Sequence, residues 1–143
     1  MIKIAPPLAG LIDSALADGT PCLVGTVSKD GRPNISVKGS VLVLDDKTLA
    51  YWERAYRNAH KNVGDNPRVV VWYRNAAKAD QLPRGAAVRF HGTATIHASG
   101  PLRDKVWNRT VPIEQERDPD RKGAAVVIAL DKIEDLMGAP LPA

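Results

Sequence analysis

Residues 33–53 read PNISVKGSVLVLDDKTLAYWE, and this stretch decides the fold class. Apolar side chains alternate with polar ones over residues 35–41, which is the spacing of a strand whose two faces differ. The apolar run Val41–Leu44 is followed by the polar turn Asp45-Asp46-Lys47 and by a β-prone return at Thr48–Glu53. Because so short a turn joins only antiparallel neighbours, the stretch predicts an antiparallel hairpin.

The sequence on both sides adds further strands. Upstream, Asp30-Gly31 is a hairpin dipeptide between a strand expected at Cys22–Ser28 and one at Pro33–Lys38. Downstream strands are expected at Arg68–Tyr73, at Ala87–His97 with a bulge or bend at Gly92, and at Ala124–Leu130. The run Arg68–Tyr73, RVVVWY, is so apolar that it predicts burial on both faces. The polar segment Pro112–Lys122 is expected to be irregular.

Helices are expected only as short elements beside the strands. Apolar residues at helical spacing predict one helix over Leu8–Leu16, ended by Gly19. A short polar helix is expected at Ala55–Asp65, where Asn66-Pro67 closes it, and another opens at Gly100-Pro101. Long strands with small peripheral helices predict a mostly β architecture in which the antiparallel strands close into a barrel.

The composition limits the class of protein. A length of 143 residues, with 44% hydrophobic and 25% charged residues, fits a single domain over residues 1–143. No apolar run approaches the roughly 20 residues that span a bilayer, and the N-terminus lacks the pattern of a secretory signal. The one cysteine, Cys22, begins an apolar strand, which predicts a buried thiol and excludes an internal disulfide. We therefore expect a cytoplasmic protein with no membrane partner.

The charge favours anionic partners without choosing among them, since the formal net charge is +4. The tight basic group is Arg54, Arg57, His60 and Lys61, which is enough charge for a pocket but is not the basic stripe of a nucleic-acid binder. We expect no nucleic-acid partner. The sequence has no glycine-rich phosphate loop, no serine nucleophile elbow and no helical histidine pair, so we expect no metal site and can name no catalytic residue.

The most informative region for binding begins on the strand after the first hairpin. Ser36, Lys38 and Ser40 share one face of this strand, and we expect that face to point outward. Its hydroxyls and backbone could bond a planar polar ligand, with Lys38 balancing negative charge. The alternative is an exposed hairpin strand with no ligand.

A second part of the candidate site follows the next strand. Tyr51 and Trp52 point to opposite faces, so at most one is expected in the core, and the other is a candidate to stack on a ring system. Arg57, Asn58 and Lys61 fall at the start of the short helix, where free backbone N–H groups and a guanidinium suit a phosphate. The alternative is a solvated, charged helix start.

The run GRPNISVKGSVLVLDDKTLAYWERAYRNAHKNVGDNPRVVVWY, followed by AAVRFHGTATI, resembles the pyridoxamine 5'-phosphate oxidase-like FMN-binding split barrels. The resemblance covers roughly residues 8–130 and is closest to the small bacterial FMN-binding proteins. It rests on the order of the Asp-Gly hairpin, the basic helix ending in Asn-x-x-x-Asn-Pro-Arg-Val, and the later strand with a central glycine. It implies a six-stranded antiparallel split β-barrel with Greek-key connections, and a homodimer that holds FMN at its interface.

The resemblance also implies a set of cofactor-binding residues. These are Ser36, Val37, Lys38 and Ser40 along the flavin, Tyr51, Trp52 and Glu53 beside the isoalloxazine ring, and Arg57, Asn58 and Lys61 at the phosphate. The family's phosphate-binding segment is often Ser-Arg-Lys, and this sequence has Arg57-Asn58-Ala59 in its place. Arg57 could supply the guanidinium from one position earlier, and Lys61 could replace the missing lysine.

The implied function is an FMN flavoprotein oxidoreductase of unknown substrate. The C-terminal Arg- and Trp-containing motif of the true pyridoxamine phosphate oxidases is missing from this sequence, so oxidation of vitamin B6 is not the first expectation. Two alternatives stay open: a relative that binds a deazaflavin or haem, and an FMN-binding or storage protein without turnover. The apolar runs RVVVWY and AAVVIAL favour a homodimer, and Trp107 is expected either at the interface or as a cap on the barrel.

Overall fold

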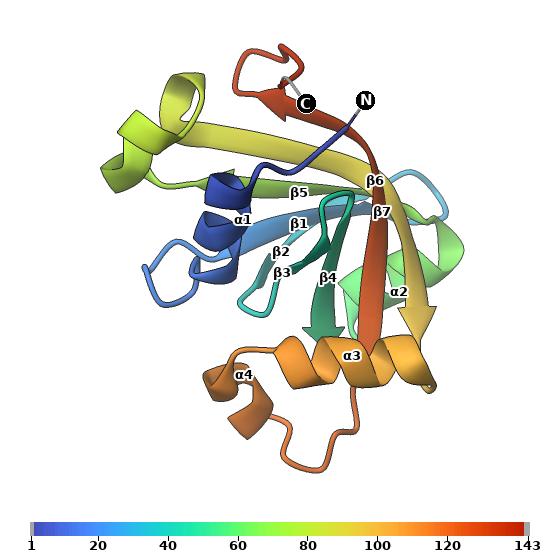
Figure 1. The fold of residues 1–143 in the computed structure, drawn as a ribbon. Helices are drawn as coiled ribbons and strands as arrows, with labels where there is room; N and C mark the ends of the chain where they lie inside the picture. The colour runs from blue at the N-terminus through green and yellow to red at the C-terminus, as the bar shows by residue number, and fades with distance from the viewer. Residues whose placement is uncertain (1, 142–143) are drawn as a thin grey trace.

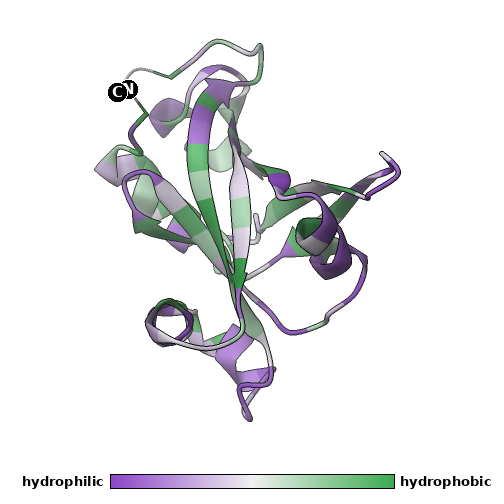
Figure 2. Ribbon diagram, turned by 90° about the vertical axis from the view of Figure 1, so that its right-hand side faces the viewer, coloured by the Kyte–Doolittle hydropathy of each residue, from purple (hydrophilic) through white to green (hydrophobic). Residues whose placement is uncertain are grey.

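The computed structural model describes residues 2–141, and its centre is one antiparallel sheet of seven strands (Figure 1). The strands are β1 (Cys22–Val27), β2 (Pro33–Lys38), β3 (Leu42–Asp45), β4 (Thr48–Glu53), β5 (Arg68–Arg74), β6 (Ala87–His97) and β7 (Ala124–Asp135). Their order in the sheet is β2-β1-β5-β6-β7-β4-β3, so β2 and β3 are its two edges. In Figure 2 the hydrophobic residues gather in the strands, and hydrophilic residues dominate the connecting loops.

Short helices surround the sheet. They are α1 (Pro6–Asp13), α2 (Asn58–Asp65), α3 (Pro101–Arg109) and α4 (Pro112–Glu116), with 3₁₀ turns at Ala76–Gln81 and Arg84–Ala86. Figure 1 shows α3 lying across the ends of β4 and β7, with α4 directly after it. The predicted irregular segment therefore contains a helix, and Pro112 stands at its first position, where proline is favoured.

The sheet buries apolar side chains on both faces of β4. Tyr51 belongs to the main core, and Trp52 belongs to a smaller cluster that also contains Val106 of α3. Both aromatic residues are buried, at 0% and 3% exposure. The expectation that at most one of them is core is wrong, because α3 covers the outer face of the strand. Trp107 caps this cluster, with its ring centroid 4.8 Å from that of Trp52.

The mostly β, antiparallel split-barrel class is confirmed, but two details of the prediction are wrong. The sheet has seven strands rather than six, because the four-residue β3 adds a short hairpin partner to β4. The sheet is also not closed into a barrel, since its edges β2 and β3 do not pair with each other. The chain passes directly from one edge to the other through residues 39–41.

The face that β2 presents to the interior is the reverse of the predicted one. Ile35 and Val37 are 73% and 63% exposed, whereas Ser36 and Lys38 are half-buried. The pairing with β1 explains this, because Ser36 lies opposite buried Val24 and so turns toward the interior. The polar side chains of β2 therefore line the inside of the split barrel, and its apolar side chains face out.

Several other predictions can be compared with the structure directly. The strand β5 is buried on one face only, because Val70 and Trp72 remain half-buried on the outer face. The expected irregularity at Gly92 is confirmed as a register shift between β6 and β7, where a Cβ would collide with the backbone of Ala129. Cys22 is buried as expected, and burial raises the pKa of its thiol to about 12. Within residues 2–141, every helix is too short or too polar to cross a membrane.

Candidate functional site

A row of polar side chains runs along the inner face of β2 and connects two cavities. Asn34, Ser36 and Lys38 form this row, and Asn34 Nδ2 donates a hydrogen bond to Ser36 Oγ at 3.1 Å. Asn34 and Lys38 are four steps apart along an extended strand, so the row is roughly 13 Å long. One cavity lies at the Lys38 end and the other at the Asn34 end.

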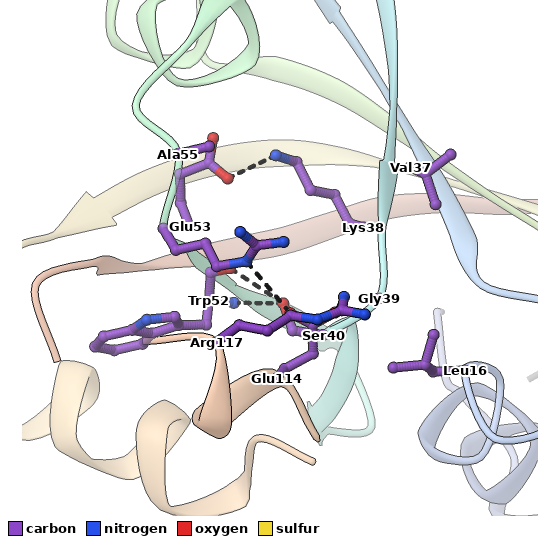
Figure 3. A pocket seen from close by; sticks show the side chains of 11 residues that line it. Leu16, Val37, Lys38, Gly39, Ser40, Trp52, Glu53, Ala55, Glu114 and Arg117 are labelled. Atoms are coloured by element: carbon purple, nitrogen blue, oxygen red, sulfur yellow. Dashed lines mark hydrogen bonds and ion pairs between the residues drawn. The ribbon is translucent and has the colours of Figure 1, made fainter. Parts of the chain in front are cut away.

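The first cavity has a volume of about 330 Å³ and lies where β2, β4 and α4 meet (Figure 3). It is lined by Leu16, Val37, Lys38, Gly39, Ser40, Trp52, Glu53, Arg54, Ala55, Glu114 and Arg117. Gly39 leaves room for the Glu114 carboxylate of α4 beside the end of β2, because a Cβ at this position would make that carboxylate move. Gly39 and Glu114, 75 positions apart in the chain, thus share one wall.

The charged groups of the first cavity are arranged in two separate sets. Lys38 Nζ lies 2.6 Å from Glu53 Oε2, and these side chains are 13% and 3% exposed. Glu114 accepts a hydrogen bond from Arg117 at 3.0 Å and lies 3.7 Å from Arg54 Nε. Both carboxylates are buried, and both arginines are exposed to solvent. Lys38, which the sequence suggested as the counter-charge of a ligand, is therefore already paired with a carboxylate of the protein itself.

Hydrogen bonds fix the position of Trp52, one of the residues that line this cavity. The Ser40 hydroxyl donates to the Trp52 carbonyl at 3.1 Å and accepts from the Trp52 backbone N–H at 3.0 Å. The indole Nε1 donates to Asp118 Oδ2 at 2.8 Å. Desolvation acts to raise the pKa of Asp118, but the hydrogen bonds from Trp52 and from the backbone of Lys122 and Gly123 lower it below its ordinary value. This carboxylate stays ionised and ties the segment after α4 to β4.

The second cavity has a volume of about 360 Å³ and lies at the start of α2. It is lined by Ser28, Asp30, Arg32, Pro33, Asn34, Asn58, Lys61 and Asn62. Arg57 is the exposed N-cap residue of the helix, and Lys61 forms an exposed ion pair with Asp65 at 2.9 Å. The cations Arg32 and Lys61, three side-chain amides and the backbone N–H groups of the helix start together provide the donors that a phosphate group needs.

The structure divides the predicted site residues between the two cavities. Five line the first and two line the second: Val37, Lys38, Ser40, Trp52 and Glu53, and then Asn58 and Lys61. Ser36 lies between the cavities on β2, and Arg57 lines neither of them. Tyr51 is buried in the core, with its ring centroid 5.4 Å from Lys38 Nζ. Burial, followed by the nearby charge of Glu53, raises the pKa of this tyrosine above its ordinary value.

Sequence reasoning missed the residues that reach the cavities from distant segments. Glu114 lies on α4 and Arg117 directly after it, in a segment that follows α3 and carries no motif. The helix-starting Pro112 was the one available signal for this element. Arg32 and Asn62 also line the second cavity, and their contribution depends on how the β1–β2 hairpin packs beside α2.

Comparison with known proteins places the chain in a family. The family model described as pyridoxamine 5'-phosphate oxidase matches residues 10–136, which is nearly the whole chain. The chain belongs to the pyridoxamine 5'-phosphate oxidase family. No functionally curated protein matches it in sequence.

Solved structures of this family and fold resemble the chain over most of its length. HupZ of Group A Streptococcus has a TM-score of 0.76 at 25% identity and covers 97% of this chain and 99% of its own. A putative pyridoxamine 5'-phosphate oxidase from Lactobacillus delbrueckii has a TM-score of 0.68 at 21% identity. The match covers 93% of this chain and 94% of the Lactobacillus chain. An FMN-binding protein from Syntrophomonas wolfei has a TM-score of 0.65 at 15% identity. The match covers 87% of this chain and 83% of the Syntrophomonas chain. An F420 reductase and HutZ, the haem storage protein of Vibrio cholerae, share the fold at 16% identity, with TM-scores of 0.57 and 0.60.

Proposed function

We infer that this protein is an FMN-binding oxidoreductase. The observation that carries the proposal is the polar row of Asn34, Ser36 and Lys38, which joins the basic, amide-rich second cavity to the first cavity between β2, β4 and α4. FMN has matching parts in the same sequence: a phosphate, a chain of hydroxyls and a flat polar ring. The family membership supports a flavin, and an FMN-binding protein is among the structures that share the fold.

The second cavity is the proposed phosphate site. Arg32 and Lys61 supply positive charge there, and Asn34, Asn58 and Asn62 supply amide donors. The start of α2 adds backbone N–H groups and the positive end of the helix dipole. Asn62 is buried and fastens the helix to β1, which holds the helix start in place, while Arg32, Asn58 and Lys61 are exposed beside it.

The first cavity is the proposed site of the ring and of the reacting partner. The bound flavin supplies the electron-transfer chemistry, and the protein supplies orientation and charge. Ser40 and Asp118 fix the position of Trp52 from two sides. The exposed Arg54 and Arg117 lie among the lining residues, and α4 encloses the cavity beside the end of β2. No side chain here is assigned as a catalytic acid or base.

A homodimer is part of the proposal, because the outer face of the sheet beside β2 is apolar and open. Ile35 is 73% exposed and, with Leu23, Val70 and Trp72, lines a shallow hollow of about 270 Å³. An apolar patch on an edge strand and its neighbours is unfavourable in water, and a second copy of the same face would cover it. The polar face of the same strand lines the proposed flavin site, so a partner packed on the outer, apolar face of β2 would help to hold the strand in position.

The experiment that tests this function compares cofactors on the purified protein. Absorbance of the protein as isolated shows whether a flavin is bound, and thermal shifts are then measured with FMN, a deazaflavin coenzyme and haem. Because only a ligand that binds the native state raises the melting temperature, FMN is expected to give the largest shift. A larger shift with deazaflavin or haem would replace FMN in the proposal. Tight FMN binding without reduction by nicotinamide nucleotides would favour storage over turnover.

A further inference from the structure

The ion pair between Lys38 and Glu53 changes the electrostatics of the proposed flavin site. Glu53 is the last residue of β4, and its carboxylate meets the Lys38 ammonium across the cavity wall at 2.6 Å. The Glu53 side chain is 3% exposed and that of Lys38 is 13% exposed, so solvent screens the pair only weakly. Glu53 therefore offsets most of the positive charge that Lys38 would otherwise bring to the site.

The other charged groups of the cavity do not replace Glu53 in this role. Glu114 is engaged by Arg117 and Arg54 on the opposite wall, at 3.0 Å and 3.7 Å. Among residues 2–141, the ion pair of Lys38 is with Glu53 and the ion pair of Glu53 is with Lys38. The two residues thus act as one unit that is close to neutral.

We propose that Glu53 is a positioning residue that offsets the charge of Lys38 and thereby lowers the reduction potential of FMN bound at this site. The inference rests on the proposed function. Reduction adds negative charge to a flavin ring, so a nearby cation favours the reduced form and a nearby anion opposes it. In a partly buried site such charges act more strongly than they do in water. Lys38 alone would raise the potential, and Glu53 removes much of that effect.

The structure predicts opposite shifts for the two halves of the pair. Glu53→Gln leaves Lys38 uncompensated and is expected to raise the potential of bound FMN. Lys38→Met leaves a buried carboxylate without its partner and is expected to lower it. The double variant carries neither charge and is expected to return close to the wild-type potential. Glu53→Asp keeps the charge and is expected to stay near wild type.

The test is a reduction titration of the FMN-loaded protein against indicator dyes of known potential. Glu116→Gln is the matched control, because it removes one negative charge from an exposed position on α4. A higher potential in Glu53→Gln, with Glu116→Gln unchanged, supports the proposal. Equal potentials in Glu53→Gln, Glu116→Gln and wild type would overturn it.

A second comparison covers the case in which Glu53→Gln folds poorly or loses FMN. Lys38→Met is then compared with the double variant in the same buffer as the main titration. A lower potential in Lys38→Met than in the double variant supports the role of Glu53, and equal values contradict it. Failure of the wild type to bind FMN would overturn the proposed function and this inference together, whereas FMN binding with unchanged potentials overturns this inference alone.

Discussion

Asn62 Nδ2 donates a hydrogen bond to Thr26 Oγ1 at 3.1 Å, and this buried contact fastens α2 to β1. The two side chains are 6% and 1% exposed. Asn62 also lines the second cavity, so one side chain links the barrel interior to the proposed phosphate site. The helix is therefore held by the apolar packing of the buried Ala59 and Val63 and by this one buried side-chain hydrogen bond.

Replacing this asparagine is expected to weaken both the fold and the site. Asn62→Ala leaves the Thr26 hydroxyl without its partner and should lower the free energy of unfolding by about 1–3 kcal/mol. Urea denaturation of the protein without cofactor measures this loss. Asn108→Ala, an exposed change on α3, serves as the control and should have little effect. Equal stability of the two variants would show that the contact contributes nothing.

The outer face of β2 is expected to hold two copies of the chain together. Ile35→Asp places a charge at the centre of the apolar face and should convert a dimer to a monomer in sedimentation or light scattering. Leu102→Asp, at a residue that is 38% exposed on α3, makes the same chemical change away from that face. A monomeric wild type, or a dimer that survives Ile35→Asp, would contradict this assignment of the interface.

The carboxylate of Glu134 is expected to contribute stability that is lost in acid. Hydrogen bonds from Lys132 and then His91 lower its pKa from 4.5 to about 2. A group whose pKa is depressed by folding stabilises the protein above its unfolded pKa, and this contribution disappears as the pH falls from 4.5 toward about 2. Glu134→Gln should therefore flatten the fall in melting temperature across that range. A fall as steep as that of the wild type would mean that other carboxylates cause it.

The thiol of Cys22 is expected to be inert in the folded protein. Its side chain is 1% exposed, and burial raises its pKa to about 12, so little thiolate forms near neutral pH. A chromogenic disulfide reagent should react slowly with the native protein and rapidly, with one thiol per chain, after denaturation. Rapid reaction under native conditions would show that the start of β1 opens readily.

The elements that could be predicted from the sequence are those with a strong local signal. Alternation, apolar runs and the Asp30-Gly31 dipeptide located the strands, because a strand's period and its turns depend on neighbouring residues. The same reasoning assigned the wrong faces to β2, since Ile35 and Val37 look like core residues until the pairing with β1 is known. The alternation of apolar and polar residues shows that a strand has two different faces, but it does not show which of them points into the core.

The part of the candidate site that comes from one stretch of sequence could be predicted. The part that distant segments contribute was missed. Lys38 and Asn58 come from one stretch of sequence and line the cavities that the structure forms. The partner of Lys38 could not be predicted, because the contact with Glu53 depends on how β2 and β4 face each other across the open sheet. The contribution of Glu114 could not be predicted for the same reason, since α4 comes from a distant part of the chain.

The most direct test of the central claim is a calorimetric titration of the purified protein with FMN and with riboflavin, which lacks the phosphate. The proposed site predicts one FMN per chain and weaker binding of riboflavin. Lys61→Ala should weaken FMN binding about tenfold and leave riboflavin binding unchanged, because it removes one charged contact to the phosphate. Lys105→Ala, an exposed change on α3, should alter neither. No saturable FMN binding, or equal affinity for FMN and riboflavin, would contradict the proposed site.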